Sequence, residues 1–264
     1  MKEILLTDGG LGSELRMRGV EVPSHVNSIW SAQALIDAPQ AVEAIHIDYI
    51  YAGSDYITIN NYGLTQPILR RAGLENRLKE MTISAIDLAK SAVSKTNKVN
   101  VIVCETMSSG LEAKCALEAA LKTEMEVWVS WTLHGNRPNV LPSGETIHEA
   151  FLALDDLKPN AYLVNCCGAN FVGQAIKELK ELTNLPIGGY ANAENITVIS
   201  EGVNLVDDAE DLQKQSLKEI NEEEYATEVA KWIDNGASIV GGCCRTRPGY
   251  IKESIIYRLS QNRS

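Results

Sequence analysis

The chain has 264 residues, of which 45% are hydrophobic and 22% charged, an ordinary composition for a globular protein. It carries 24 Lys and Arg against 35 Asp and Glu, a formal net charge of −11. Neither nucleic acid nor a membrane is therefore expected as a partner, because nucleic acid and anionic lipid both attract clusters of Lys and Arg. No apolar stretch is long enough to cross a bilayer, and the first apolar run is too short for a secretory signal. Six cysteines without such a signal favour reduced thiols, so we expect a cytoplasmic protein.

Short apolar runs alternate with amphipathic stretches along almost the whole chain. The runs predict eight strands: Ile4–Asp8, Ser28–Ser31, Asp55–Asn60, Asn100–Glu105, Glu126–Thr132, Ala161–Cys166, Pro186–Tyr190 and Ser238–Gly242. The stretches between them predict helices: Pro39–Ala52, Asn76–Ser94, Gly110–Lys122, Ala169–Leu182, Glu222–Asn235 and Pro248–Leu259. This alternation, without a linker, predicts an α/β fold in which residues 1–264 form a single (β/α)8 TIM-type barrel. If Ser28–Ser31 is not a strand, an open doubly wound sheet is the alternative.

Two stretches interrupt the alternation and are predicted as loops. His134–Glu145 is rich in Asn, Pro and Gly and follows the fifth strand, and the acidic stretch Ala191–Asn221 follows the seventh. In a barrel both would lie at the C-terminal ends of the strands, where active sites are built. Loops of that length inside a domain are usually functional or mobile.

Two acidic residues stand at predicted strand ends. Asp8 ends the first strand and precedes Gly9 and Gly10, and Glu105 ends the fourth strand. In a barrel both would reach the same mouth, where two carboxylates could hold a substrate ammonium group by charge-assisted hydrogen bonds. The alternatives are helix capping and a salt bridge within a loop. The glycines after Asp8 do not complete a dinucleotide-binding pattern, because Leu15 stands where its third glycine would be.

Four of the six cysteines lie at the ends of two predicted strands, as the adjacent pairs Cys166-Cys167 and Cys243-Cys244. Neighbouring side chains of a strand point to opposite faces, so Cys243 and Cys244 can converge only if the chain turns there. The glycines that precede them permit such a turn. With Cys166 as a third thiolate, the set would match a catalytic zinc site with one open position. The alternatives are buried free thiols, which are common in cores, and a disulfide between neighbours.

The ligand set indicates which reaction such a zinc centre would favour. Three thiolates leave it with a formal charge of −1, which makes it a poor activator of water. It would still keep a bound thiol deprotonated near neutral pH, and that thiolate would stay electron-rich enough to attack carbon. Thiol alkylation therefore suits the site better than hydrolysis.

Several segments together resemble the zinc-dependent homocysteine S-methyltransferases. They are Asp8–Leu15, Asn60-Asn61-Tyr62, Glu105-Thr106, Asn165-Cys166 and Gly241–Pro248, and they run from the first predicted strand to the last helix. The resemblance implies a barrel with zinc bound by Cys166, Cys243 and Cys244. It also implies that Asp8 and Glu105, with the backbone near Gly9, bind the amino-acid part of homocysteine. The Asn165-Cys166 pair favours Cys166 over Cys167 as the ligand.

The resemblance implies direct transfer of a methyl group from a donor to the thiol of homocysteine, giving methionine. We expect a small onium donor, namely S-methylmethionine, S-adenosylmethionine or a betaine-like compound. The protein is expected to act as a monomer or homodimer. A barrel that binds zinc or a thiol without turnover, as a sensor or accessory subunit, is the alternative.

Overall fold

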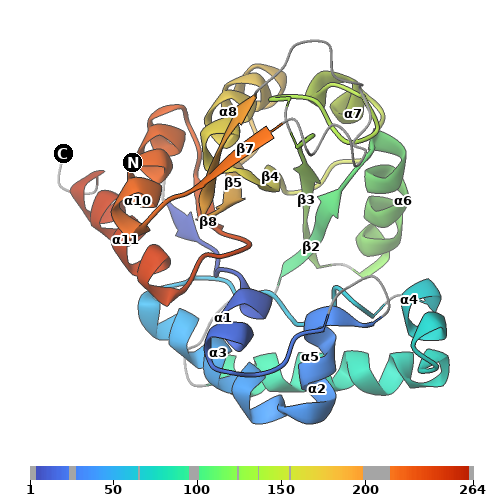
Figure 1. Cartoon of the computed structure of the whole chain (residues 1–264). Helices are drawn as coiled ribbons and strands as arrows, with labels where there is room; N and C mark the ends of the chain where they lie inside the picture. The colour runs from blue at the N-terminus through green and yellow to red at the C-terminus, as the bar shows by residue number, and fades with distance from the viewer. Residues whose placement is uncertain are drawn as a thin grey trace.

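The computed structural model describes residues 4–23, 28–64, 66–94, 101–123, 125–135, 137–154, 156–198 and 215–261. Its centre is a curved parallel sheet of six strands (Figure 1). In sheet order the strands are β1 (Leu5–Leu6), β8 (Ile239–Gly242), β5 (Ile187–Asn192), β4 (Ala161–Gly168), β3 (Glu126–Thr132) and β2 (Val101–Met107). These are six of the eight predicted strands, in the order that a (β/α)8 barrel would give them. The α/β fold class is thereby confirmed, although no ladder joins β1 to β2 among the described residues.

The predicted strand Asp55–Asn60 is not a strand, although it lies beside β1. The backbone N–H groups of Asp55 and Tyr56 both donate to the carbonyl of Leu6, at 2.7 and 3.1 Å. Other bonds that a ladder would use are instead made by side chains: Asp55 accepts from the Leu6 N–H at 2.9 Å, and Asp8 accepts from the Thr58 N–H at 2.8 Å. Side-chain acceptors thus replace the backbone carbonyls of a regular pairing.

The prediction of a strand at Ser28–Ser31 is also wrong. A 3₁₀ helix, η1, covers Trp30–Gln33. Trp30 has a φ of 51°, in the left-handed region, and its N–H donates to the Ser28 hydroxyl at 3.1 Å. A local side-chain bond and a left-handed residue are incompatible with extended backbone.

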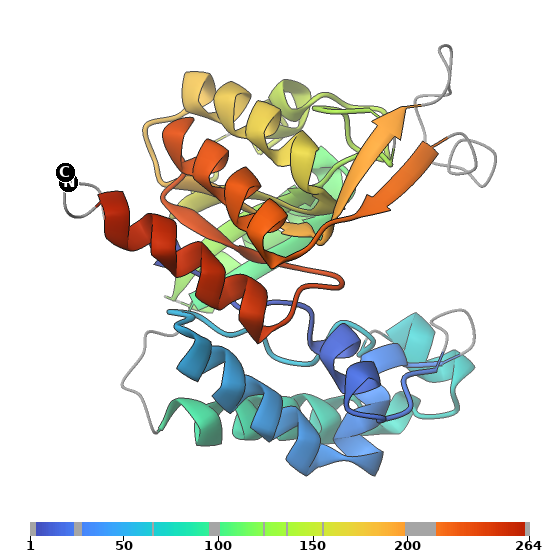
Figure 2. The same ribbon diagram turned by 60° about the vertical axis from the view of Figure 1, so that its left-hand side comes forward.

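Helices surround the sheet, and all six predicted helices are among them. The bounds of α3 (Pro39–Ala52) and α8 (Ala169–Leu182) agree with the prediction. Figure 2 shows the helices of the N-terminal third as a layer beside the sheet. The other helices are α1 (Leu11–Met17), α2 (Ala34–Asp37), α4 (Gln66–Arg71), η2 (Glu75–Arg77), α5 (Leu78–Val93), α6 (Gly110–Ala120), η3 (Leu121–Thr123), α7 (Ile147–Leu152), α10 (Glu222–Asp234) and α11 (Pro248–Gln261). No described helix has both the length and the apolar character that a membrane span requires.

The central strands bury both faces, as parallel strands do. Along β3, Val127, Val129 and Trp131 join the core beneath the outer helices, whereas Trp128 faces a second cluster with Leu163 of β4. This second cluster fills the concave side of the sheet. It closes the interior beneath the strand ends, where the cysteines and carboxylates emerge.

The two predicted loops differ in structure. His134–Glu145 contains neither helix nor strand among its described residues, as predicted. The segment after β5 instead contains an antiparallel pair of strands, β6 (Glu194–Val198) and β7 (Gln215–Glu219). Residues 199–214 of the predicted loop Ala191–Asn221 lie outside the described residues.

Candidate active site

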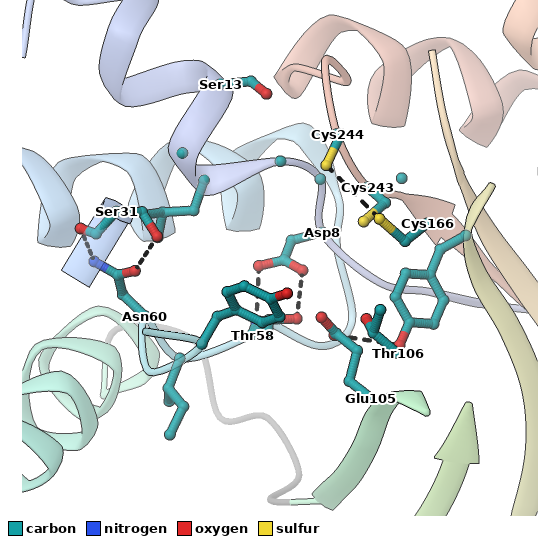
Figure 3. Close-up of a pocket in the computed structure, with 18 of the residues that line it drawn as sticks. Asp8, Ser13, Ser31, Thr58, Asn60, Glu105, Thr106, Cys166, Cys243 and Cys244 are labelled. Atoms are coloured by element: carbon teal, nitrogen blue, oxygen red, sulfur yellow. Dashed lines mark hydrogen bonds between the residues drawn. The ribbon is translucent and has the colours of Figure 1, made fainter. Parts of the chain in front are cut away.

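A pocket of about 240 Å³ opens at the C-terminal ends of the strands (Figure 3). All six residues predicted for metal or substrate binding line it: Asp8, Gly9, Glu105, Cys166, Cys243 and Cys244. The remaining lining residues are Gly10, Leu11, Gly12, Ser13, Trp30, Ser31, Thr58, Ile59, Asn60, Tyr62, Thr106, Tyr190 and Gly242.

Three thiols converge at one side of the pocket. The Sγ atoms of Cys166, Cys243 and Cys244 all lie within 4.8 Å of one another, and those of Cys166 and Cys244 are 3.9 Å apart. A tetrahedral ion with Zn–S bonds of about 2.3 Å separates its sulfur ligands by about 3.8 Å. The spacing therefore fits a zinc ion. No other group of three potential ligands of this kind occurs among the described residues.

The chain turn after β8 brings Cys243 and Cys244 to the same side. The Gly242 N–H donates to the Asp8 carbonyl at 2.9 Å, and the Cys243 N–H donates to the Ala191 carbonyl at 2.8 Å. A Cβ at Gly241 would overlap the Thr7 side chain, and one at Gly242 would overlap Thr246. Glycine is thus required for the close approach of β8 to its neighbours.

The remaining cysteines lie away from this cluster. Cys167 is 4% exposed and belongs to the core between the sheet and the outer helices. Burial raises the pKa of its thiol to about 12. Cys104 is buried in the same core, and Cys115 is exposed on α6. The two cysteines of the Cys166-Cys167 pair are therefore not equivalent, because Cys166 faces the pocket and Cys167 the core.

The three clustered thiols share protons unequally. Hydrogen bonds with Cys166 and Cys243 lower the pKa of Cys244 to about 3. Hydrogen bonds with Cys166 and Cys244, together with burial, raise the pKa of Cys243 well above that of a free thiol. The metal-free cluster thus stabilises one thiolate beside protonated neighbours, and an ion that binds all three sulfurs must displace the remaining protons.

Two carboxylates face one another in the same pocket (Figure 3). Asp8 is 3% exposed and accepts from the Thr58 N–H at 2.8 Å and the Thr58 hydroxyl at 3.0 Å. Glu105 accepts from the Tyr190 hydroxyl at 3.2 Å. Burial raises the pKa of each carboxyl to about 7, against the opposing effect of these hydrogen bonds. A cation between the two side chains would relieve this cost by favouring their ionised forms.

The raised pKa of Glu105 predicts a pH-dependent stability in the metal-free protein. Between its ordinary pKa of 4.5 and its folded value of about 7, the folded protein keeps a proton that the unfolded chain has lost. The destabilisation therefore grows as pH rises through this window and is fully present above it. Glu105→Gln, which has no such proton, should gain stability relative to wild type across the same window. Urea unfolding in a chelator at several pH values measures this difference, and a constant difference would contradict the assignment.

Sequence reasoning assigned no role to several residues that complete the pocket. Thr58 binds Asp8, Tyr190 binds Glu105, and Trp30 and Tyr62 form an aromatic pair with ring centroids 5.6 Å apart. Thr58 and Tyr190 lie in the C-terminal parts of predicted strands, and that position was the available signal. Trp30 lay in a run wrongly predicted as a strand.

The first and last loops of the sheet are locked together beside the thiols. The Gly10 N–H donates to the Thr246 hydroxyl at 3.1 Å, and the Arg245 N–H donates to the Ser13 hydroxyl at 2.8 Å. Arg247 forms an ion pair of 2.8 Å with the buried carboxylate of Glu14. The two glycine-rich segments of the sequence therefore act as one structural unit around Cys243 and Cys244.

The sequence model of the homocysteine S-methyltransferase family matches residues 5–98 and 94–254. The chain belongs to this family. Among curated members, homocysteine S-methyltransferase 4 of Zea mays is 24% identical, over 94% of this chain and 87% of that protein. Selenocysteine methyltransferase of Astragalus bisulcatus is 23% identical, over 92% of this chain and 89% of that protein.

The family's fold is also found by structural comparison. The metallated form of the homocysteine methyltransferase MmuM from Escherichia coli matches with a TM-score of 0.70 and 19% identity, over 95% of both chains. The oxidized form of the same enzyme also matches with a TM-score of 0.70, over 99% of this chain and 96% of that one. This likeness confirms the fold class that the alternation of strands and helices predicts.

Proposed function

We propose that this protein is a zinc-dependent thiol methyltransferase that moves a methyl group from a small onium donor to homocysteine, giving methionine. One observation carries the proposal: three converging thiols share a single pocket with two facing carboxylates, of which Asp8 is buried and Glu105 half-buried. The thiols suit a soft metal and the carboxylates suit an ammonium group. Homocysteine joins a thiol to an ammonium group through a short carbon chain. Membership of the homocysteine S-methyltransferase family supports the same substrate.

Cys166, Cys243 and Cys244 would hold the zinc ion and leave one coordination position open. When bound, zinc would lower the pKa of the substrate thiol, so that the thiol is a nucleophile at neutral pH. The sulfur spacing of 3.9 Å between Cys166 and Cys244 supports this ligand set. The positive charge of Arg245, which favours the Cys244 thiolate, acts in the same direction as the metal.

Asp8 and Glu105 would bind and orient the amino group of homocysteine. Thr58 fixes the Asp8 carboxylate through two hydrogen bonds, and Tyr190 binds that of Glu105, so neither needs to reorganise when the substrate arrives. The low exposure of Asp8 excludes water from this end of the pocket and strengthens the charge pairing.

Trp30 and Tyr62 support an onium donor. Both line the pocket, and their rings pack edge to face at an interplanar angle of 75°. A sulfonium or quaternary ammonium group is attracted to the face of such rings. The acidic net charge of −11 also favours a cationic donor over an anionic one.

The test is an assay of the zinc-loaded protein with homocysteine and each donor: S-methylmethionine, S-adenosylmethionine and betaine. Mass spectrometry should detect methionine with at least one of them. Binding of zinc and homocysteine without product from any donor would contradict the proposal and favour a non-catalytic thiol-binding role.

Methyl transfer is expected to proceed without a methylated protein intermediate. Cys167, the nearest thiol outside the cluster in sequence, is 4% exposed and its pKa is raised to about 12, so it can neither reach the donor nor ionise near neutral pH. Incubation with isotopically labelled donor alone, followed by peptide mass spectrometry, should leave every cysteine unlabelled. Stoichiometric label on any cysteine would instead establish a two-step route.

A further inference from the structure

Two strand ends beside the pocket adopt left-handed backbone conformations at residues other than glycine. Thr106 has a φ of 61° and Cys166 a φ of 54°. Such values are uncommon for any side chain and exceptional for a β-branched one such as threonine. Both residues lie where a strand pairing shifts register, between Cys104 and Met107 and between Asn165 and Gly168. Irregularities of this kind redirect side chains.

A single buried amide, that of Asn165, connects these two strand ends. Asn165 is fully buried in β4, and its Oδ1 accepts from the Thr106 N–H at 3.1 Å and from the Ser130 hydroxyl at 2.6 Å. Its Nδ2 donates to the Thr106 hydroxyl at 2.7 Å. Because the Thr106 N–H can only donate, the orientation of the amide is fixed. The side chain thus reaches from β4 past β3 to β2.

Left-handed backbone at such residues persists only where the surroundings hold it. Two of the three hydrogen bonds of the Asn165 amide end on Thr106, which directly follows Glu105. Asn165 itself directly precedes Cys166 in the chain. The two pocket residues are therefore each one peptide bond away from a position that this amide constrains. Among the described side chains, only that of Asn165 accepts from the backbone N–H of Thr106.

We propose that Asn165 is a positioning residue, which holds the amine-binding carboxylate of Glu105 and the metal-binding thiol of Cys166 in a fixed relation across three strands. The roles given to Glu105 and Cys166 rest on the proposed function. A purely structural amide would stabilise the sheet without affecting the two binding functions selectively.

The first test compares Asn165→Ala with wild type in two measurements. Co²⁺ affinity is followed by the sulfur-to-metal charge-transfer absorption, and the KM for homocysteine is measured on the zinc-loaded protein. Loss of a supporting residue typically weakens metal binding about 10- to 100-fold, and we expect both constants to change by roughly tenfold or more. The matched control is Asn160→Ala, which removes an amide bonded to the Val127 N–H at 2.8 Å at the opposite end of the sheet. It should leave both constants near wild type.

A second substitution separates positioning from general stability. Glycine adopts a positive φ without strain, so Thr106→Gly in the Asn165→Ala background should restore much of the homocysteine KM. It should not restore Co²⁺ affinity, because the backbone next to Cys166 still lacks the anchor that the Asn165 amide provides. Recovery of neither constant would overturn the proposed link to Glu105, and wild-type constants in Asn165→Ala would overturn the proposal as a whole.

If Asn165→Ala does not fold, Thr106→Val tests the link between Asn165 and Glu105 in milder form. Valine keeps the shape of threonine and removes the hydroxyl that Asn165 binds. We expect a raised KM for homocysteine with unchanged Co²⁺ affinity, and a wild-type KM would refute the link between Asn165 and Glu105.

A wild-type protein that binds Co²⁺ but never turns over homocysteine would contradict the proposed function alone. The Co²⁺ affinities of the Asn165 and Asn160 variants, or of Asn165→Ser where Asn165→Ala does not fold, would then still decide whether Asn165 positions Cys166.

Discussion

Cys243→Ser is expected to abolish methyl transfer and to remove most of the bound zinc. Serine replaces the thiolate with a hydroxyl that stays protonated near neutral pH and is a poor ligand for a soft metal. The loss leaves two sulfur ligands where three lie within 4.8 Å of one another. Cys166→Ser and Cys244→Ser should behave alike. Metal content by mass spectrometry and activity in the homocysteine assay provide the two measurements.

The same substitution elsewhere in the chain gives the matched controls. Cys115 is exposed on α6, and Cys167 lies in the core on the opposite side of the strand from Cys166. Cys115→Ser should change neither metal content nor activity. Cys167→Ser should retain its metal, although burying a hydroxyl in an apolar core is expected to reduce stability. Full zinc occupancy in Cys243→Ser would refute its assignment as a ligand.

Glu105→Gln is expected to raise the KM for homocysteine while leaving zinc binding nearly unchanged. Glutamine keeps the shape and can still accept from the Tyr190 hydroxyl, which is 3.2 Å from the carboxylate. It loses the negative charge that would pair with the substrate ammonium group. A charged hydrogen bond in such a pocket contributes about 1.5–3 kcal/mol, which corresponds to roughly ten- to hundred-fold in affinity.

Glu118→Gln is the matched control for this prediction, because Glu118 lies on the exposed face of α6. It should show wild-type kinetics and metal content. An unchanged KM for homocysteine in Glu105→Gln would contradict the assignment of Glu105 to the binding site. A large loss of zinc in the same variant would instead point to a role in supporting the metal cluster.

The helices and inner strands could be predicted because their hydrophobic periodicity is strong. Pro39–Ala52 and Ala169–Leu182 have the predicted bounds, and Glu126–Thr132 is a strand with the predicted bounds. The failures occur where side chains replace backbone partners. Asp55 and Asp8 accept hydrogen bonds that would otherwise form a ladder, and no pattern of apolar residues reveals that substitution.

The convergence of the three cysteines could also be anticipated, because strand ends meet at one edge of a sheet and the glycines before Cys243 permit a turn. Their role as zinc ligands stays a prediction. The Asn165 amide could not be anticipated, because its effect depends on the left-handed backbone of Thr106 on another strand. The antiparallel pair of β6 and β7 was missed because seven of its ten residues are polar.

The lock between the first and last loops has a consequence for biosynthesis. The Gly10–Thr246 hydrogen bond joins residues 236 positions apart, and the Arg247–Glu14 ion pair joins residues 233 apart. During translation, which proceeds at about 5–20 residues per second, β1 and α1 emerge long before their partners exist. The nascent chain therefore carries Cys166 before Cys243 and Cys244 have been made. The three-cysteine cluster can be completed only after β8 has emerged and docked between β1 and β5.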